Sequence, residues 1–419
     1  MHAPRSLFPR VTLPLAAFNF VNQASRAVMA VVGPVLALEF GLSASELGLL
    51  AACMFVAYGA VQLPLGIALD TVGPRRLQAA LAVLTAAGFA VFALADGLAG
   101  FVAARVMLGV GVSAGLMAII KANAQWFPST RVAAMTGWGL AIGTLGAVAA
   151  TAPAEIALPY LGWRGIFWLL GGISLASAAW MFLAMPEKAA AGPRKGLRDE
   201  MRVMGAILAS GTFWRYAPAM AMLSVLNFTY LGLWIGPWLR DVAGYDGPAR
   251  AATLFFYTLT MMGGGLVMGL ASSRAQERGF SGALVPLAGL SGLIVLQLAL
   301  ALQPAGALAV NGLWILFAFC GSAGALGYVA VGQMFPAEQM GRVATAANML
   351  TLVGAFVLQA VIGWILDLWP RTASGGWDAD GYSAALILSA AIQLAVAARL
   401  AAVAKPWRRQ VAAGGGRGG

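Results

Sequence analysis

The sequence is poor in charge and nearly free of the residue types that bind metals or form disulfides. Only 10% of its 419 residues are Asp, Glu, Lys or Arg, and it contains one His and two Cys. Soluble domains carry about 25% charged residues, so this chain lacks the side chains needed to cover a water-exposed surface. With so few His and Cys, we expect no disulfide framework and no catalytic thiol. We therefore predict no enzyme activity, no metal and no cofactor.

Apolar residues and glycine are what the sequence has in abundance. Hydrophobic residues make up 61% of the chain, and its mean hydropathy is +0.83. The 53 Gly, 13 Trp and 20 Phe suit helices that pack closely in lipid and carry aromatic residues near the membrane surfaces. Backbone groups in lipid must bond within their own segment, which favours helices. The composition predicts an all-α integral membrane protein whose surroundings are the lipid bilayer.

Stretches long enough to cross a bilayer recur along the chain. A spanning helix needs about 20 mainly apolar residues. Ten stretches without a charge meet this need: 47–69, 77–95, 132–154, 165–186, 216–239, 251–273, two within 279–337, 343–366 and 381–398. Two more, 11–38 and 98–126, contain Arg26, Arg105 and Lys121. Because 11–38 lacks the pattern of a cleaved signal peptide, we count it as a span and predict twelve transmembrane helices.

The net charge of +11 is distributed unevenly along the chain. With a cytoplasmic N-terminus, 19 basic residues fall in cytoplasmic segments and four in external ones. Basic residues concentrate in the cytoplasmic loops of membrane proteins. We predict a multi-pass protein of the cytoplasmic (inner) membrane with both termini in the cytoplasm. Because topology accounts for the basic excess, we predict no nucleic-acid partner.

Landmarks in the first half of the chain recur in the second half. The matched pairs are Gly33-Pro34 with Gly236-Pro237, Gly66 with Gly269, and Phe127-Pro128 with Phe335-Pro336, at offsets of 203, 203 and 208 residues. Parallel repeats of this kind build transporters whose halves rock around a central site. We predict an N-terminal six-helix bundle over 1–185, a cytoplasmic linker loop over 186–212, a C-terminal six-helix bundle over 213–405 and a disordered cytoplasmic tail over 406–419.

The loop after the second predicted span resembles the signature loop of the major facilitator superfamily. The matching residues are Gly66, Asp70, Gly73, Arg75 and Arg76. Thr71 and Pro74 depart from the family pattern, which has basic residues there. A second family motif in span four is matched by Arg105 and Gly109. The resemblance covers essentially the whole chain and implies two pseudo-symmetric six-helix bundles that transport a solute by alternating access.

The signature loop has a predicted role as a conformational latch. Gly66 allows close helix approach, and Asp70 can face the positive N-terminal dipole of a helix from the other half. By analogy with the family, that helix is span eleven, which begins near Arg342. The alternative is that Asp70 only ends a helix while Arg75 and Arg76 hold the topology.

The first predicted span carries a polar face that ends in an arginine. Asn19, Asn22, Gln23 and Arg26 recur at intervals of three and four residues, so they line one side of a helix. An ionisable residue at membrane depth is a candidate functional site, and a guanidinium can bind a carboxylate or phosphate through two hydrogen bonds. We predict that Arg26 contacts an anionic small-molecule substrate. The alternative is an arginine buried against helix carbonyls.

Other polar residues within spans are weaker candidates for substrate contact. Arg105 and Lys121 lie sixteen residues apart on nearly opposite helix faces, and Lys121 can equally snorkel to the membrane surface. Asn227, Tyr230 and Trp234 share one face of span seven, and Asn348 and Gln359 nearly align on span eleven. For all five of these residues, the alternative is hydrogen bonding between helices.

Departures from known branches of the family limit the prediction. The organic-anion branch has an Asp-Arg pair in span one and a Glu in span four, where this chain has Ser25-Arg26 and Val112. The anion-binding part of that pattern is present, and the part that carries protons is missing. The drug–proton antiporter motif is also incomplete, because Thr144 and Ala147 replace its Pro and Gly. A multidrug antiporter is therefore disfavoured.

Other classes of function fit the sequence less well. Gly111-Val112-Ser113-Ala114-Gly115 has the letters of a serine nucleophile motif, but it lies in a predicted helix and the single His is in the N-terminal tail. Channels usually build selectivity from repeated rings, which two six-span halves do not provide. We predict a monomeric secondary active transporter of a small solute, an organic anion, that works by rocker-switch alternating access. The alternatives are an exporter of drugs or metabolites and a transporter-like membrane sensor without catalytic activity.

Overall fold

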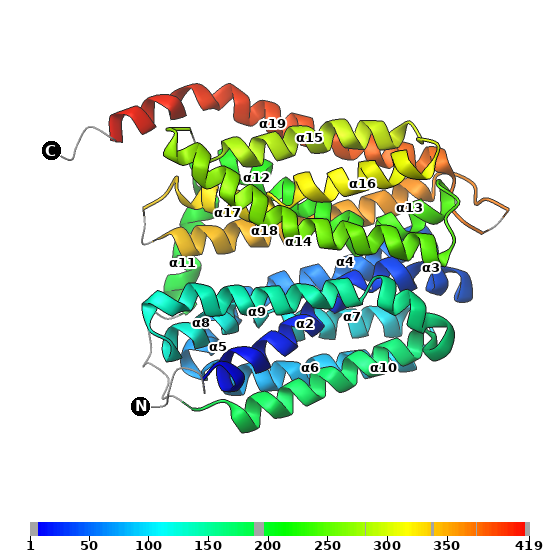
Figure 1. The fold of residues 1–419 in the computed structure, drawn as a ribbon, viewed down its shortest axis with the longest axis horizontal. Coiled ribbons are helices and arrows are strands. Elements are labelled where there is room, and N and C mark those ends of the chain that lie inside the picture. Colours follow the sequence, from blue (N-terminus) through cyan, green and yellow to red (C-terminus); the bar gives the residue numbers. More distant parts are fainter. Residues whose placement is uncertain (1–6, 188–196, 281, 337–338, 374, 415–419) are drawn as a thin grey trace.

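The chain forms twelve membrane spans and no strand within the residues that the structure describes (Figure 1). The structure is a computed structural model that describes residues 7–187, 197–280, 282–336, 339–373 and 375–414, without the side chains of 63, 70, 129, 133, 197–200 and 401–414. In this part, ten helical stretches are each long and apolar enough to cross a membrane. A bent pair, Phe8–Ala27 with Met29–Glu39, adds an eleventh span, and the shorter apolar helix Ala44–Ala60 begins the twelfth.

The N-terminal half contains spans 1 to 6. These are η1 (Phe8–Thr12) with α2 (Leu13–Ala27) and α3 (Met29–Glu39); α4 (Ala44–Ala60) with α5 (Gln62–Thr71); α6 (Pro74–Leu94); α7 (Leu98–Val112) with α8 (Gly115–Trp126); α9 (Ser129–Ala149); and α10 (Ala152–Ala184). The helix α10 is kinked at Gly162, whose φ of 64° is a left-handed conformation that glycine adopts without strain. The charged spans predicted at 11–38 and 98–126 are both present.

The C-terminal half contains spans 7 to 12. These are α12 (Gly211–Thr229) with η2 (Tyr230–Trp234) and α13 (Ile235–Asp241); α14 (Gly247–Glu277); α15 (Leu284–Ala301); α16 (Ala307–Gly321) with α17 (Gly324–Gly332); α18 (Met340–Leu366); and α19 (Ala379–Gly414). The segment 186–212, predicted as a loop, contains the helix α11 (Leu197–Ala209). The helix α19 extends through 406–414, a segment for which the sequence analysis predicts disorder; 415–419 lie outside the described residues.

Spans 1 and 7, which occupy equivalent places in the two halves, are both irregular near their middle. Span 1 bends by 45° at Val28, between α2 and α3. Span 7 passes through a π-helical turn over Tyr230–Trp234. Short π segments and interrupted helices are frequent at functional sites, because they leave backbone groups and side chains in arrangements that a regular helix does not allow. The irregular parts of both spans therefore mark a candidate site between the halves.

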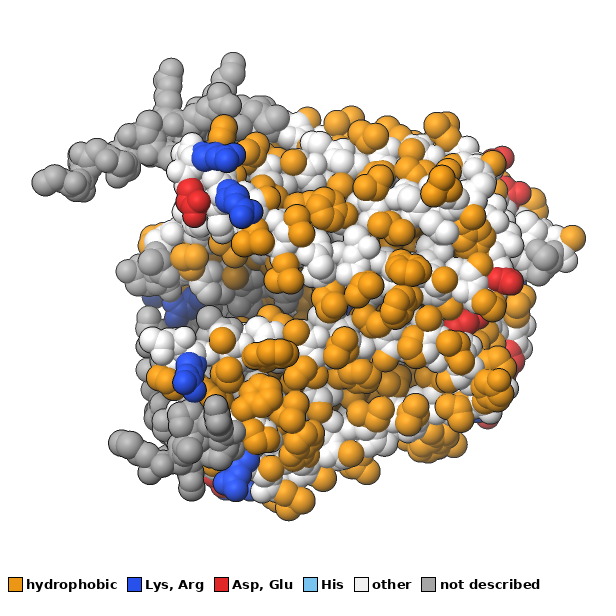
Figure 2. Space-filling view, in the orientation of Figure 1, with side chains coloured by type: hydrophobic (Ala, Val, Ile, Leu, Met, Phe, Trp, Pro, Cys, Tyr) orange, Lys and Arg blue, Asp and Glu red, His pale blue; other side chains and the backbone are white. Residues whose placement is uncertain are grey.

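Charge separates the two ends of the molecule. Helix ends and loops at one end, here named the basic end, carry Arg75, Arg76, Arg131 and Arg278. Those at the other end, the acidic end, carry Glu39, Asp96, Asp246 and Asp367. Figure 2 shows the arginines and lysines gathered at one end and most of the acidic side chains at the other. The apolar surface between the ends is the part suited to lipid. This separation is what the positive-inside pattern of the sequence predicts.

Candidate functional site between the two halves

The two halves meet closely at the acidic end. Gly236 of span 7 lies against the backbone of span 1, so that a Cβ at this position would come within 2.0 Å of the carbonyl oxygen of Ala30. A Cβ at Gly363 of span 11 would lie 2.4 Å from the carbonyl oxygen of Ala44 in span 2. Glycine permits this approach because it has no side chain. Gly236, one of the repeated landmarks in the sequence, is therefore part of the contact that closes this end.

Polar contacts reinforce the closure at the acidic end. Asp367, at the end of span 11, accepts hydrogen bonds from the backbone N–H groups of Ala44 and Ser45, both at 2.8 Å. These groups begin span 2, where an unpaired N–H and the helix dipole favour a carboxylate. Glu155 and Arg250 form an ion pair between the halves at 3.3 Å. We name Asp367, Ala44, Ser45, Glu155 and Arg250 the acidic-end clasp.

The halves separate toward the basic end. Spans 2 and 11 remain in contact as far as Gly59, where a Cβ would lie 3.8 Å from Leu352. About two turns further along span 2, a Cβ placed on Gly66 would have no neighbouring atom within 4 Å. Figure 2 shows a recess between the halves that opens at this end. The structure is therefore closed at the acidic end and open at the basic end.

Arg26 lies between the halves, two residues before the bend in span 1. Its guanidinium lies over the ring of Tyr58 from span 2, at 4.8 Å, and over the ring of Phe228 from span 7, at 5.4 Å. Its Nε atom is buried without a hydrogen-bond partner, and no described residue forms an ion pair with it. Cation–π contacts offset only part of the cost of burying a charge. Arg26 therefore presents unused donors and an uncompensated positive charge.

The other polar residues of span 1 contact spans 4 and 5 of the same half. The Asn19 amide donates to the carbonyl oxygen of Gly139 at 3.4 Å and accepts from the Asn22 amide at 3.2 Å. Gly143 and Gly115 make room for these two side chains. The Oδ1 atom of Asn22 is buried without a partner, whereas Gln23 is half-buried. On this polar face, Asn19 joins helices by hydrogen bonds, whereas Asn22, four residues before Arg26, keeps an amide oxygen that can accept another hydrogen bond.

Arg105 is buried within the N-terminal half. Its side chain is 1% exposed and donates from Nε to the carbonyl oxygen of Leu50 at 3.2 Å and from Nη1 to that of Ser25 at 2.9 Å. These bonds join span 4 to spans 1 and 2, and the second one ends directly beside Arg26. In this conformation, Arg105 positions the backbone that carries Arg26 and does not face the recess.

Replacing Arg105 should affect folding more than substrate affinity. Arg105→Ala removes two charge-assisted hydrogen bonds that join span 4 to spans 1 and 2, and each is worth roughly 1.5–3 kcal/mol. We expect the melting temperature of the purified protein to fall by on the order of 5–10 °C, measured by intrinsic fluorescence. The melting temperature should fall less in Arg105→Lys. It should not change in Arg131→Ala, which replaces an exposed arginine. An unchanged melting temperature with weakened ligand binding would instead place Arg105 in the substrate site.

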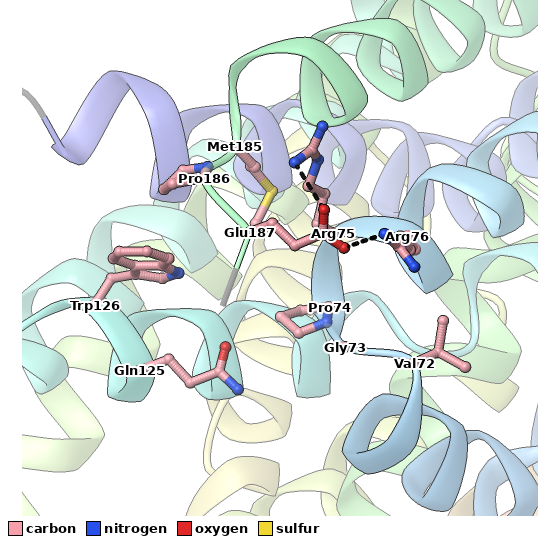
Figure 3. Close-up of a pocket in the computed structure, with 10 residues that line it drawn as sticks. All are labelled: Val72, Gly73, Pro74, Arg75, Arg76, Gln125, Trp126, Met185, Pro186 and Glu187. Atoms are coloured by element: carbon pink, nitrogen blue, oxygen red, sulfur yellow. Dashed lines mark ion pairs between the residues drawn. The ribbon is translucent and has the colours of Figure 1, made fainter. Parts of the chain in front are cut away.

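Lys121 and the signature loop form contacts within the N-terminal half at the basic end. The Lys121 ammonium donates to the carbonyl oxygen of Leu69, near the end of span 2. Arg75 donates to the carbonyl oxygen of Phe182 at 3.0 and 2.6 Å, and both Arg75 and Arg76 pair with Glu187 (Figure 3). Gly73 has a φ of 89°, which permits the turn into α6. The side chain of Asp70 lies outside the described residues, so its predicted latch contact stays a prediction.

On the predicted face of span 7, Asn227 and Tyr230 bond inside the C-terminal half, whereas Trp234 also lies against Gly48 of span 2. The Asn227 amide accepts from the Tyr257 hydroxyl at 2.8 Å and lies against Gly321. The Tyr230 hydroxyl donates to Ser389 at 3.3 Å, and the Trp234 ring contacts that of Trp377. The structure does not bring these three side chains to Arg26. Their neighbour Phe228 occupies that position instead.

The two span 11 candidates differ in their surroundings. Gln359 is fully buried and donates to the carbonyl oxygen of Phe228 at 3.1 Å, next to the π-helical turn. Its Oε1 atom has no partner. Asn348 is half-buried and forms no hydrogen bond with a described residue. Asn348 therefore retains its full hydrogen-bonding capacity, whereas Gln359 fixes the backbone behind Phe228.

Sequence reasoning missed the aromatic side chains that surround Arg26. Tyr58 and Phe228 come from spans 2 and 7, and Phe55 stacks on Phe228 with ring centres 5.6 Å apart. Aromatic residues are frequent in all membrane helices, so no spacing in the sequence distinguishes these three. A signal was available only on span 1, where Arg26 is the one charge in a long apolar run.

Comparison with known proteins agrees with this architecture. The sequence model described as Major Facilitator Superfamily matches residues 15–358. The chain belongs to this superfamily. It is therefore a multi-pass membrane protein, and the twelve-helix fold predicted from the sequence is confirmed.

Several relatives and solved structures that this chain resembles are named as transporters, and the chain spans less than two thirds of the length of the first of these relatives. It is 31% identical over 164 residues to a protein named "Probable L-galactonate transporter" from Escherichia coli (strain K12); the match covers 38% of this chain and 36% of that protein. It is 23% identical to the hexuronate transporter of Bacillus subtilis (strain 168), over 86% of this chain and 89% of that protein. A solved bacterial homolog of the human lysosomal transporter Spinster, inward-facing and unoccupied, is similar in fold, with a TM-score of 0.75, 17% identity and 98% of each chain covered.

Proposed function

We propose that this superfamily member is a secondary transporter that moves a small organic anion, a carboxylate, across the cytoplasmic membrane. The observation that carries the proposal is the uncompensated guanidinium of Arg26 between the halves, with a buried Nε that has no partner. A carboxylate matches the geometry and charge of a guanidinium, as a phosphate does. The names of two relatives, which refer to L-galactonate and hexuronates, support the same substrate class because both are sugar carboxylates.

Alternating access at this site requires that the two ends open in turn. The described conformation, open at the basic end, corresponds to an inward-facing state if the basic end is cytoplasmic. Substrate binding at Arg26 would offset the unfavourable energy of a half-buried, unpaired charge next to the aromatic side chains of both halves. Opening at the acidic end then requires the acidic-end clasp to break, as the two bundles rock about the site.

A ligand-stabilisation screen tests the substrate class. Purified protein would be heated with organic acids, phosphate esters, amino acids or cationic drugs, and its unfolding followed by intrinsic fluorescence. A ligand at 100 times its Kd stabilises the folded state by about 2.7 kcal/mol. We expect carboxylates to raise the melting temperature. Stabilisation by cations alone would contradict the proposed anion site.

A further inference from the structure

A groove on the outer side of the C-terminal half shares no lining residue with the surroundings of Arg26. It has a volume of about 210 Å³ and lies between spans 7, 11 and 12. All of its lining residues are apolar, among them Ala221, Val225, Gly354, Val357, Ile392 and Val396. Gly354 keeps the groove deep, because a side chain there would meet Val225. A polar ligand would find no hydrogen-bond partner among these side chains.

The groove has the position and length expected for a lipid chain. Its span 11 residues run from Leu350 to Val361, a rise of roughly 16 Å, close to one leaflet of a hydrocarbon core about 30 Å thick. Val357 is 49% exposed and Ile392 is 40% exposed, so the groove opens outward from the helix bundle. At this depth the surrounding medium is hydrocarbon.

Two arginines continue the groove toward the basic end. Arg215 precedes the lining residue Pro218 by three positions on α12, and Arg399 follows Val396 by three positions on α19. Residues three apart share a helix face, so both arginines extend the groove past its apolar part. Both are exposed, and neither forms an ion pair with a described residue. Basic pockets between spans at the cytoplasmic surface attract anionic lipid head groups.

We propose that this groove binds one anionic phospholipid. One acyl chain lies along spans 7, 11 and 12, where close packing against apolar side chains stabilises it. The phosphate contacts Arg215 and Arg399 at the basic end. The proposal does not depend on the proposed transport function, and it places the lipid in the cytoplasmic leaflet because the predicted topology puts the basic end in the cytoplasm.

Native mass spectrometry of protein released from bilayers that contain equal amounts of phosphatidylglycerol and phosphatidylethanolamine tests this site. The full-length protein should retain one phosphatidylglycerol. The double variant Arg215→Gln/Arg399→Gln should lose roughly 30-fold in phosphatidylglycerol affinity. Val357→Phe, which fills the groove from a half-exposed position, should lose the bound lipid as well. Equal retention of both lipids by the wild type, or an unchanged phosphatidylglycerol signal in these variants, would overturn the proposal.

Matched controls distinguish this site from general lipid contact. Val267→Phe makes the same change at a 52% exposed position on α14, and Arg274→Gln removes a basic-end arginine outside the groove. Both should retain the lipid as the wild type does; loss in either one would indicate non-specific binding. Solute uptake measured on the same preparations separates the two proposals, because lipid retention is read out without any transported solute. Displacement of the lipid by an organic acid that binds at Arg26 would also contradict a separate lipid site.

Discussion

Replacing Arg26 by alanine should abolish transport while leaving the protein folded. The substitution removes the proposed carboxylate partner from the site between the halves, where its loss costs about 3 kcal/mol of binding, roughly 100-fold in Kd. It also removes a half-buried, unpaired charge, so the melting temperature should stay the same or rise. Substrate affinity is measured by isothermal titration and uptake by reconstituted vesicles.

Two further variants make the result specific to the guanidinium. Arg26→Lys keeps the charge but loses the paired geometry, so it should retain a small part of the activity. Arg131→Ala removes an exposed arginine of the same half and should transport as the wild type does. Normal uptake of an organic anion by Arg26→Ala would contradict the assigned site, whatever the stability of the variant.

Replacing Asp367 by alanine should shift the protein toward the state that is open at the acidic end. The change removes two charge-assisted hydrogen bonds to Ala44 and Ser45, which exist only while the halves are closed there. With about 2 kcal/mol lost from the closed state, its population relative to the open one should fall roughly 30-fold. Spin labels at Tyr160 and Leu308, exposed at the acidic end on opposite halves, report the opening by electron spin resonance.

The control is an acidic residue whose ion pair stays within one half. Asp96 pairs with Arg164 at 3.2 Å, and both lie in the N-terminal half. Asp96→Ala should leave the distance between the two labels unchanged. If Asp367→Ala also leaves it unchanged, the hydrogen bonds to span 2 do not hold the acidic end closed.

The contact of Asp367 is the same kind of interaction, at the opposite end of the molecule, as the one predicted for Asp70 of the signature loop. Asp70 at the end of span 2 was predicted to face the start of span 11; Asp367 at the end of span 11 faces the start of span 2. In both cases a carboxylate meets the positive end of a helix dipole from the other half. The same pair of helices would therefore hold each end closed in turn, and Gly66, free of contacts in this conformation, belongs to the disengaged end.

The fold was predictable because the membrane imposes strong rules. Hydrocarbon thickness sets the length of each span, and the separation of basic from acidic loops follows from topology. The breaks at Val28 and over Tyr230–Trp234 were not predicted, although Gly33-Pro34 and Gly236-Pro237 follow them, because transmembrane helices tolerate glycine and proline without breaking at a fixed position. Such breaks are set by packing between the halves, which depends on residues far apart in the sequence.

The site was predictable only in part. Arg26 was found because a charge at membrane depth is costly and therefore conspicuous. Arg105 carries the same signal, yet the structure places it against the carbonyl oxygens of Ser25 and Leu50, contacts that spacing along one helix cannot reveal. Asn227 lies on the predicted face of span 7, but that face is turned into the C-terminal half. Helix periodicity identifies a face and leaves open which neighbour it meets.

Uptake of a hexuronate and of the corresponding hexose into vesicles that contain the purified protein tests the central claim most directly. The two solutes share a sugar ring and differ in the carboxylate, so the comparison isolates the group that Arg26 is proposed to bind. The account predicts uptake of the hexuronate well above that of protein-free vesicles, with no uptake of the hexose, and loss of the hexuronate signal in Arg26→Ala. Equal transport of the neutral hexose, or hexuronate transport that persists without Arg26, would contradict it.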